Sequence, residues 1–84
     1  METSKPIKHF RHGKVNLAVW ENEGPDGTFY SYTVQRSIPR EGESGYDNYK
    51  SFGRWDSRNL MRCILDFDAF VDKKEREAEK AKAA

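Results

Sequence analysis

The side chains of this chain that could catalyse a reaction or hold a metal ion do not fall at the spacings that such sites need. His9 and His12 are three residues apart, so a β-strand would place them on opposite faces, where they cannot bind one metal ion together. Cys63 is the only cysteine, which leaves it without a partner for a disulfide or a zinc site. Asp68 and Asp72 are helix neighbours, but the basic residues around them are typical of a solvated surface. We therefore expect no enzymatic activity, no metal and no cofactor.

A different set of residues has the chemistry of a ligand-binding surface. Aromatic rings stack on nucleobases and cations contact phosphates, and both occur here among amides and hydroxyls in segments that alternate with a period of two. A Trp and a Phe beside a turn are also consistent with a small cluster that stabilises the end of a hairpin. The binding interpretation selects six residues, namely Arg11, Lys14, Asn16, Trp20, Phe29 and Thr33.

Four β-strands would position these residues. Apolar and polar side chains alternate through residues 14–20, so Val15, Leu17 and Val19 share one face. Gly-Pro and Asp-Gly pairs within residues 21–27 are turn signals and predict a hairpin. Strands are expected at residues 7–12, 14–20, 28–38 and about 46–52, with an exposed loop within residues 37–50.

The same pattern predicts how the hairpin strands pair. A slip of one residue would move every apolar side chain to the wrong face of the sheet, which restricts the register. The predicted pairs are Val19 with Tyr30, Leu17 with Tyr32, Val15 with Val34, Trp20 with Phe29, Asn16 with Thr33 and Lys14 with Gln35. In the first strand Phe10 is expected to face the core, which sends His9 and Arg11 to the open face.

After Gly53 the apolar period becomes helical, with a stripe at Leu60, Ile64, Phe67 and Val71. Asp56 or Ser57 is the expected N-cap of this helix. We predict an α+β fold in which a four-stranded antiparallel sheet is followed by one long C-terminal helix, in the order ββββα. The predicted organisation is a flexible leader at residues 1–6, a single domain at residues 7–72 and a charged, fraying helical tail at residues 73–84.

The predicted core is small. The chain has 84 residues, of which Leu, Ile, Val and Phe make up only 15, although aromatic residues form 13% of the composition. A core of this size barely offsets the conformational entropy that folding removes, so further burial against a second copy is expected. We therefore predict a homodimer, with the helical stripe over residues 60–71 at or near its interface.

Charge is distributed unevenly along the chain. The net charge is +1, but residues 1–20 carry +3 and residues 21–84 carry −2, which favours an anionic partner. No apolar run approaches the 18 or so residues of a membrane span, and the N-terminal residues do not resemble a signal peptide. We expect a cytoplasmic protein without a membrane partner.

Three short motifs resemble a group of short uncharacterised bacterial proteins. They are Gly13-Lys14-Val15, Val34-Gln35-Arg36-Ser37 and Ser51-Phe52-Gly53-Arg54 ahead of Leu60, and the similarity covers about residues 7–71. More remotely, the ββββα order is similar to the positive cofactor four and Whirly-like family of single-stranded DNA-binding proteins. That architectural resemblance implies a dimer formed through the helical side and single-stranded DNA bound on the sheet, without assigning any binding residue.

We interpret the sequence as a single-stranded DNA- or RNA-binding module with little sequence preference, acting as an accessory protein in transcription or replication. The alternative is a non-enzymatic adaptor that binds another protein through the same open sheet face. The two interpretations differ in salt dependence, because neutralising phosphates makes affinity fall steeply as salt rises.

Overall fold

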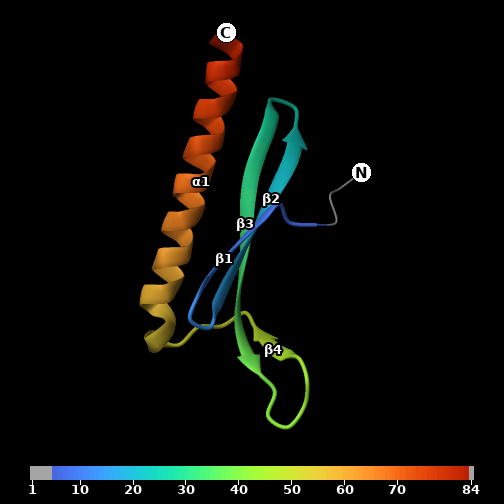
Figure 1. The fold of residues 1–84 in the computed structure, drawn as a ribbon, viewed down its shortest axis with the longest axis vertical. Coiled ribbons are helices and arrows are strands. Elements are labelled where there is room, and N and C mark those ends of the chain that lie inside the picture. Colours follow the sequence, from blue (N-terminus) through green and yellow to red (C-terminus); the bar gives the residue numbers. More distant parts are fainter. Residues whose placement is uncertain (1–4, 84) are drawn as a thin grey trace.

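The computed structural model describes residues 5–83 and consists of an antiparallel sheet followed by one long helix (Figure 1). The elements are β1 (Lys8–His12), β2 (Val15–Gly24), β3 (Gly27–Pro39), β4 (Tyr46–Tyr49), the 3-10 turn η1 (Arg54–Asp56) and α1 (Ser57–Ala83). The four strands pair in chain order, and the predicted α+β fold of order ββββα is confirmed. Most of the predicted leader, residues 1–4, lies outside the described residues.

β2 and β3 form a long hairpin whose register differs from the predicted one. Val19 lies opposite Tyr32 rather than Tyr30, and Leu17 lies opposite Val34 rather than Tyr32. The strands continue to a tight two-residue connection, Pro25–Asp26, and this turn fixes a register two residues away from the prediction. Because side chains alternate with a period of two, the shift changes every partner but leaves the residues paired between β2 and β3 on their predicted faces.

The connection between β3 and β4 is shorter than predicted. β3 continues to Pro39, which pairs with Tyr46, so the expected loop over residues 37–50 is reduced to residues 40–45. The Arg40 side chain closes this loop, with its Nε 3.0 Å from a carboxylate oxygen of Asp47. The fourth strand ends at Tyr49 and does not reach residue 52 as expected.

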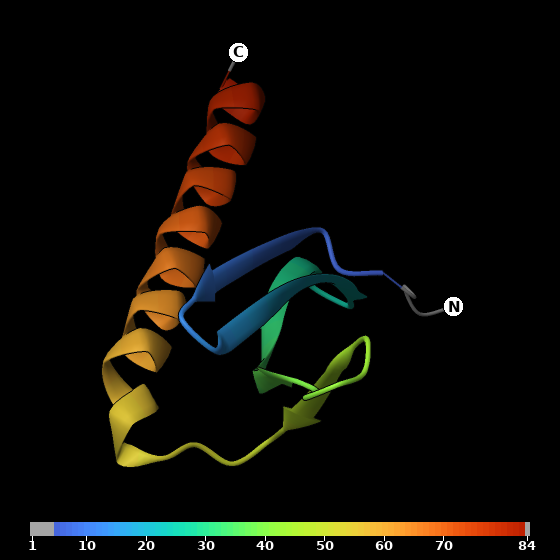
Figure 2. The same ribbon diagram turned by 60° about the horizontal axis from the view of Figure 1, so that its bottom comes forward.

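The core lies between α1 and one face of the sheet. Val15, Leu17 and Val19 of β2 are fully buried together with Cys63 of α1. Figure 2 shows α1 along β1 and β2, with β4 on the side of the sheet away from the helix. Partly buried residues complete this core, namely Phe10, Tyr30, Val34, Phe52, Leu60, Ile64, Phe67 and Phe70. Few side chains are fully buried, so each contributes a large share of the stability.

Aromatic rings and polar contacts hold α1 on the sheet. Tyr32 packs edge-on against Phe67 with ring centroids 4.7 Å apart. His12, on the core side of β1, lies 2.6 Å from a carboxylate oxygen of Asp66. The face predicted for β1 is correct, since the register of β1 and β2 places Phe10 beside Leu17 on the core side. No helix within residues 5–83 is long and apolar enough to cross a membrane.

The contacts at the start of α1 differ from the predicted N-cap. Asp56 precedes the helix directly, but its carboxylate accepts the N–H of Gly53 at 3.0 Å instead of an amide of the first helical turn. The same carboxylate lies 3.8 Å from Nε of Arg36, which also donates to the carbonyl of Ser51 at 3.1 Å. These contacts connect β3 to the segment that leads into α1, and so fix where the helix begins.

Cys63 is expected to react slowly while the protein is folded. Its Sγ lies 3.7 Å from the carbonyl oxygen of Val15, and burial raises the pKa of the thiol. A raised pKa in the folded state stabilises the fold below the ordinary thiol pKa, and that stabilisation is lost as pH rises through the folded value. Modification by an aromatic disulfide reagent should therefore be much faster in urea than in buffer. Equal rates in the two solutions would show that the thiol is accessible in the folded protein.

Candidate functional site

The face of the sheet opposite α1 carries amides, hydroxyls and aromatic rings. Strand pairing places on this face His9, Arg11, Asn16, Ala18, Trp20, Asn22, Phe29, Ser31, Thr33, Gln35, Ser37, Tyr46 and Asn48. This set contains no Asp or Glu, whereas Glu21, Glu23 and Asp47 belong to the opposite face. The open face therefore lacks the strand carboxylates that would repel an anionic ligand.

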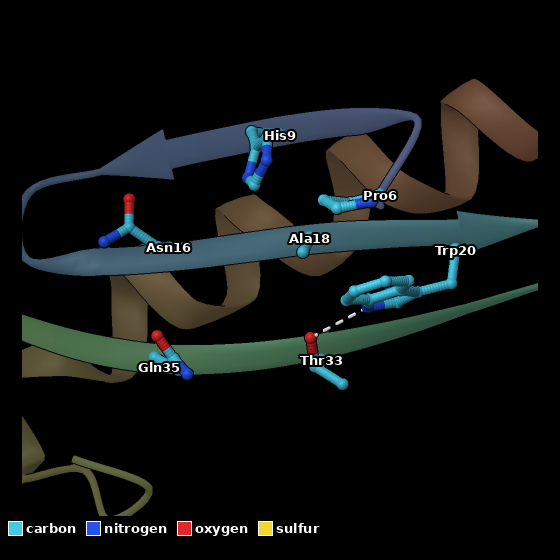
Figure 3. Close-up of a pocket in the computed structure, with 7 residues that line it drawn as sticks. All are labelled: Pro6, His9, Asn16, Ala18, Trp20, Thr33 and Gln35. Atoms are coloured by element: carbon cyan, nitrogen blue, oxygen red, sulfur yellow. Dashed lines mark hydrogen bonds between the residues drawn. The ribbon is translucent and has the colours of Figure 1, made fainter. Parts of the chain in front are cut away.

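A groove of about 420 Å³ is hollowed into this face (Figure 3). Its lining residues come from β1, β2, β3 and the segment before β1, and they are Pro6, His9, Asn16, Ala18, Trp20, Thr33 and Gln35. The indole N–H of Trp20 donates to the hydroxyl of Thr33 at 3.0 Å, which orients the ring across the sheet. The small side chain of Ala18 leaves room between the larger residues. This volume is within the range of small-molecule sites, about 300–1,000 Å³.

Two polar side chains in the groove have no hydrogen-bond partner within residues 5–83. They are the imidazole of His9 and the amide of Gln35, both of which are exposed. Asn16 is partly engaged, because its amide nitrogen donates to the hydroxyl of Ser37 at 2.7 Å. The groove thus presents donors and acceptors that are free to pair with the polar edge of a ligand.

A chain of hydrogen bonds runs across the open face beside the groove. Ser37, which is buried, accepts from Asn16 and donates to the side-chain oxygen of Asn48 at 2.8 Å. These three residues lie on β2, β3 and β4, so the chain of bonds crosses three strands. Such a network fixes the positions of neighbouring side chains before a ligand arrives.

The open face is concave. The guanidinium carbon of Arg11, on β1, lies 5.6 Å from the ring centroid of Tyr46, on β4. β1 and β4 are the two edges of the sheet, so this contact shows that the sheet curls until side chains from its edges meet. Arg11 is held further by its Nε, which donates to the carbonyl of Gly13 at 3.2 Å. The groove is therefore bordered by a cation and an aromatic ring.

The structure brings together four of the six residues predicted for binding. Asn16, Trp20 and Thr33 line the groove, and Arg11 lies on the same face. Phe29 is also on this face, but it lies opposite Asn22, toward the end of the hairpin.

The three pairs predicted among these residues were all wrong. Asn16 lies opposite Gln35 rather than Thr33. Trp20 lies opposite Ser31 rather than Phe29, and within residues 5–83 no ring contact joins the Trp and the Phe. Lys14 is not on a strand opposite Gln35, because it forms the turn between β1 and β2 with Gly13. Its carbonyl accepts the N–H of Ser37 at 2.8 Å, and its side chain is exposed at the end of the sheet.

Other residues of the site were missed. His9 and Gln35 were assigned to the open face by their alternation but were not selected for binding. Pro6 was assigned to the leader, although it lines the groove. Tyr46 was missed because its contact with Arg11 depends on the curl of the sheet, which has no signal in the sequence.

Comparisons with known proteins do not help to identify the ligand of this face. No family model, curated protein or solved structure matches this chain.

Proposed function

We propose that the concave face of the sheet binds single-stranded nucleic acid with little sequence preference. The observation that carries the proposal is the Trp20 ring, held by Thr33 beside a groove whose His9 and Gln35 side chains lack partners within residues 5–83. A base stacking on an aromatic ring and pairing its edge with nearby amides is the usual mode of single-strand recognition.

The arrangement of charge supports an anionic ligand. Arg11 borders the groove, Lys14 lies in the turn at the end of the sheet, and no strand carboxylate shares the open face. Phe29, 53% exposed, offers a second ring further along the same face. A strand running along the face would stack bases on the rings and place phosphates near the cations.

The same features favour a single strand over a duplex. Paired bases are stacked inside a helix, where neither the Trp20 ring nor the groove amides can reach their faces. Contacts through stacking and through adaptable amides such as Gln35 discriminate weakly among bases. We propose that the protein acts in the cytoplasm, as a binding module and not as an enzyme.

The salt dependence of binding tests this proposal. Affinity for a labelled single-stranded oligonucleotide is expected to fall as salt rises, and Arg11→Ala should make the slope of log K against log salt shallower by about 0.7. Lys80→Ala removes the same charge from the exposed end of α1 and should leave the slope unchanged. Fluorescence anisotropy at several salt concentrations provides the measurement.

The outcome also separates the proposal from the adaptor alternative. A protein ligand on the same face would not require phosphate neutralisation, so wild-type protein would show no salt-dependent binding to DNA or RNA oligonucleotides. That result would contradict the nucleic-acid proposal. Tighter binding to duplex than to single strands would contradict it as well.

A further inference from the structure

Trp55 lies in solvent just before α1 begins. Of the large apolar side chains within residues 5–83 it is the most exposed, at 91%, and its indole makes no hydrogen bond or ring contact there. Met61 and Leu65 follow on α1 and are 61% and 64% exposed. Neighbouring apolar side chains that the fold leaves uncovered are typical of an interaction site.

A hollow of about 780 Å³ lies beside Trp55. All of its lining residues come from η1 and the start of α1, and they are Arg54, Trp55, Ser57, Arg58, Asn59 and Met61. None of them belongs to the core. A ligand can therefore occupy this hollow without displacing any side chain that holds α1 on the sheet.

The charges around the hollow are positive. Arg54, Arg58 and Arg62 are exposed and make no ion pair within residues 5–83. Asp56 is the only acidic residue in this segment, and its carboxylate is engaged by Gly53 and Arg36. Basic residues near the start of a helix oppose its dipole, so the stability of α1 does not explain these arginines. An anionic partner does explain them.

The residue types are those of a protein interface. Trp, Met and Arg are enriched in such interfaces, whereas Lys and Glu are depleted. Residues 54–65 contain one Trp, one Met and three Arg but neither Lys nor Glu, whereas residues 73–80 of the same helix contain three Lys and three Glu. Arginine also binds carboxylates through two parallel hydrogen bonds, which lysine cannot form. The start of α1 therefore differs in composition from the solvated end of the helix.

We propose that this surface binds an acidic segment of another protein that also carries large apolar side chains. The Trp55 surface, as we call it, consists of Arg54, Trp55, Arg58, Met61, Arg62 and Leu65. The apolar side chains of the partner cover Trp55 and Met61, and its carboxylates pair with Arg58 and Arg62. These two arginines are one helical turn apart on the same side of α1. The surface extends for about 15 Å along the helix, which suits a short segment.

Asp68 separates this partner from a nucleic acid or a membrane. It is exposed, makes no ion pair within residues 5–83 and lies within about 60° of Leu65 around the helix. A nucleic-acid backbone or an anionic bilayer lying along α1 would bring phosphates against this carboxylate. A short protein segment ends before it. Met61 and Leu65 also have no ring on which a base can stack, whereas apolar side chains of a protein cover them well.

Selection from a displayed peptide library tests the class of partner. The library consists of random peptides about 12 residues long, which is about 18 Å as a helix. Peptides retained by the wild-type protein but not by Trp55→Ala should be rich in Asp and Glu and carry at least one large apolar residue. Trp20→Ala, which changes the open face of the sheet, should retain the same peptides. Recovery of neutral or basic peptides, or of none that depends on Trp55, would overturn the proposal.

Charge reversal tests the role of the arginines. Arg58→Glu and Arg62→Glu together should raise the Kd of a selected peptide by about a hundredfold, because repulsion replaces two carboxylate pairs. Lys73→Glu and Lys80→Glu together change the net charge equally on exposed parts of α1, and should raise the Kd by less than about threefold. Fluorescence anisotropy of the labelled peptide measures both values, and circular dichroism checks that each variant is folded. Equal losses in the two double variants would show that only overall charge matters, which would overturn the proposal.

Two other probes test the alternative partners. Binding of a single-stranded oligonucleotide, or of vesicles made from equal parts of phosphatidylcholine and phosphatidylglycerol, should not depend on Trp55. A loss of oligonucleotide binding in Trp55→Ala would assign the surface to nucleic acid, and a loss of vesicle binding would assign it to a membrane. Either loss would overturn the proposal. The peptide measurements involve no nucleic acid, so they succeed or fail separately from the function proposed for the concave face.

Discussion

Replacing Trp20 by alanine is expected to weaken single-strand binding by about 1–3 kcal/mol, a rise in Kd of roughly 5- to 150-fold. The loss follows from removing the ring that Thr33 orients beside the groove. The slope of log K against log salt should stay nearly constant, because stacking involves no phosphate contact. Titration of a labelled oligonucleotide at two or more salt concentrations measures both quantities.

Two further variants make this result specific to stacking. Trp20→Phe keeps an aromatic ring but loses the hydrogen bond to Thr33, so it should retain most of the affinity. Trp55→Ala removes the same side chain from the start of α1, where it is 91% exposed, and should not affect binding. Wild-type affinity in Trp20→Ala, with its fold intact by circular dichroism, would contradict the proposed site. Equal losses in the two alanine variants would contradict it too.

Leu17→Ala is expected to lower the free energy of unfolding by about 2–5 kcal/mol. Leu17 is fully buried at the centre of the core, between Phe10 on β1 and Val34 on β3 in the strand pairing. Removing its side chain leaves a cavity that the few surrounding core residues cannot fill. The total stability of a chain of this length is about 4–13 kcal/mol, so the loss is a large share of it.

Urea denaturation of both proteins at the same concentration measures this loss in the free energy of unfolding. Phe29→Ala is the matched control, since Phe29 lies on the open face with 53% of its surface exposed. Phe29→Ala should lower the free energy of unfolding by much less than Leu17→Ala does. If Leu17→Ala lowers the free energy of unfolding by less than about 1 kcal/mol, the core tolerates the loss of a buried side chain better than its small size suggests.

Alternation of side chains was enough to predict which face of the sheet each strand residue occupies. Val15, Leu17 and Val19 repeat every second residue, and any arrangement that buries one of them buries all three. The same constraint sends Asn16 and Trp20 to the other face. For this reason the face assignments survived a register that was wrong by two residues.

The helix was predictable for a similar reason but only in part. The apolar stripe containing Leu60, Ile64 and Phe67 has the helical period, and these residues pack on the sheet. The sequence did not show that Met61 and Leu65 would be left exposed. One helix can turn only part of its circumference toward a single sheet, and which part depends on the contacts of His12 with Asp66 and of Phe67 with Tyr32.

The sequence by itself determined the order of elements, the faces of the strands and the residue types that the open face presents. Tertiary structure alone decided the partners across the hairpin, because the two-residue turn at Pro25–Asp26 and not the apolar pattern fixes the register. It also decided that Arg11 meets Tyr46, since that contact joins the two edges of a curled sheet. Periodicity records which side of an element a residue lies on, whereas turn geometry and sheet curvature determine which residues from distant segments meet.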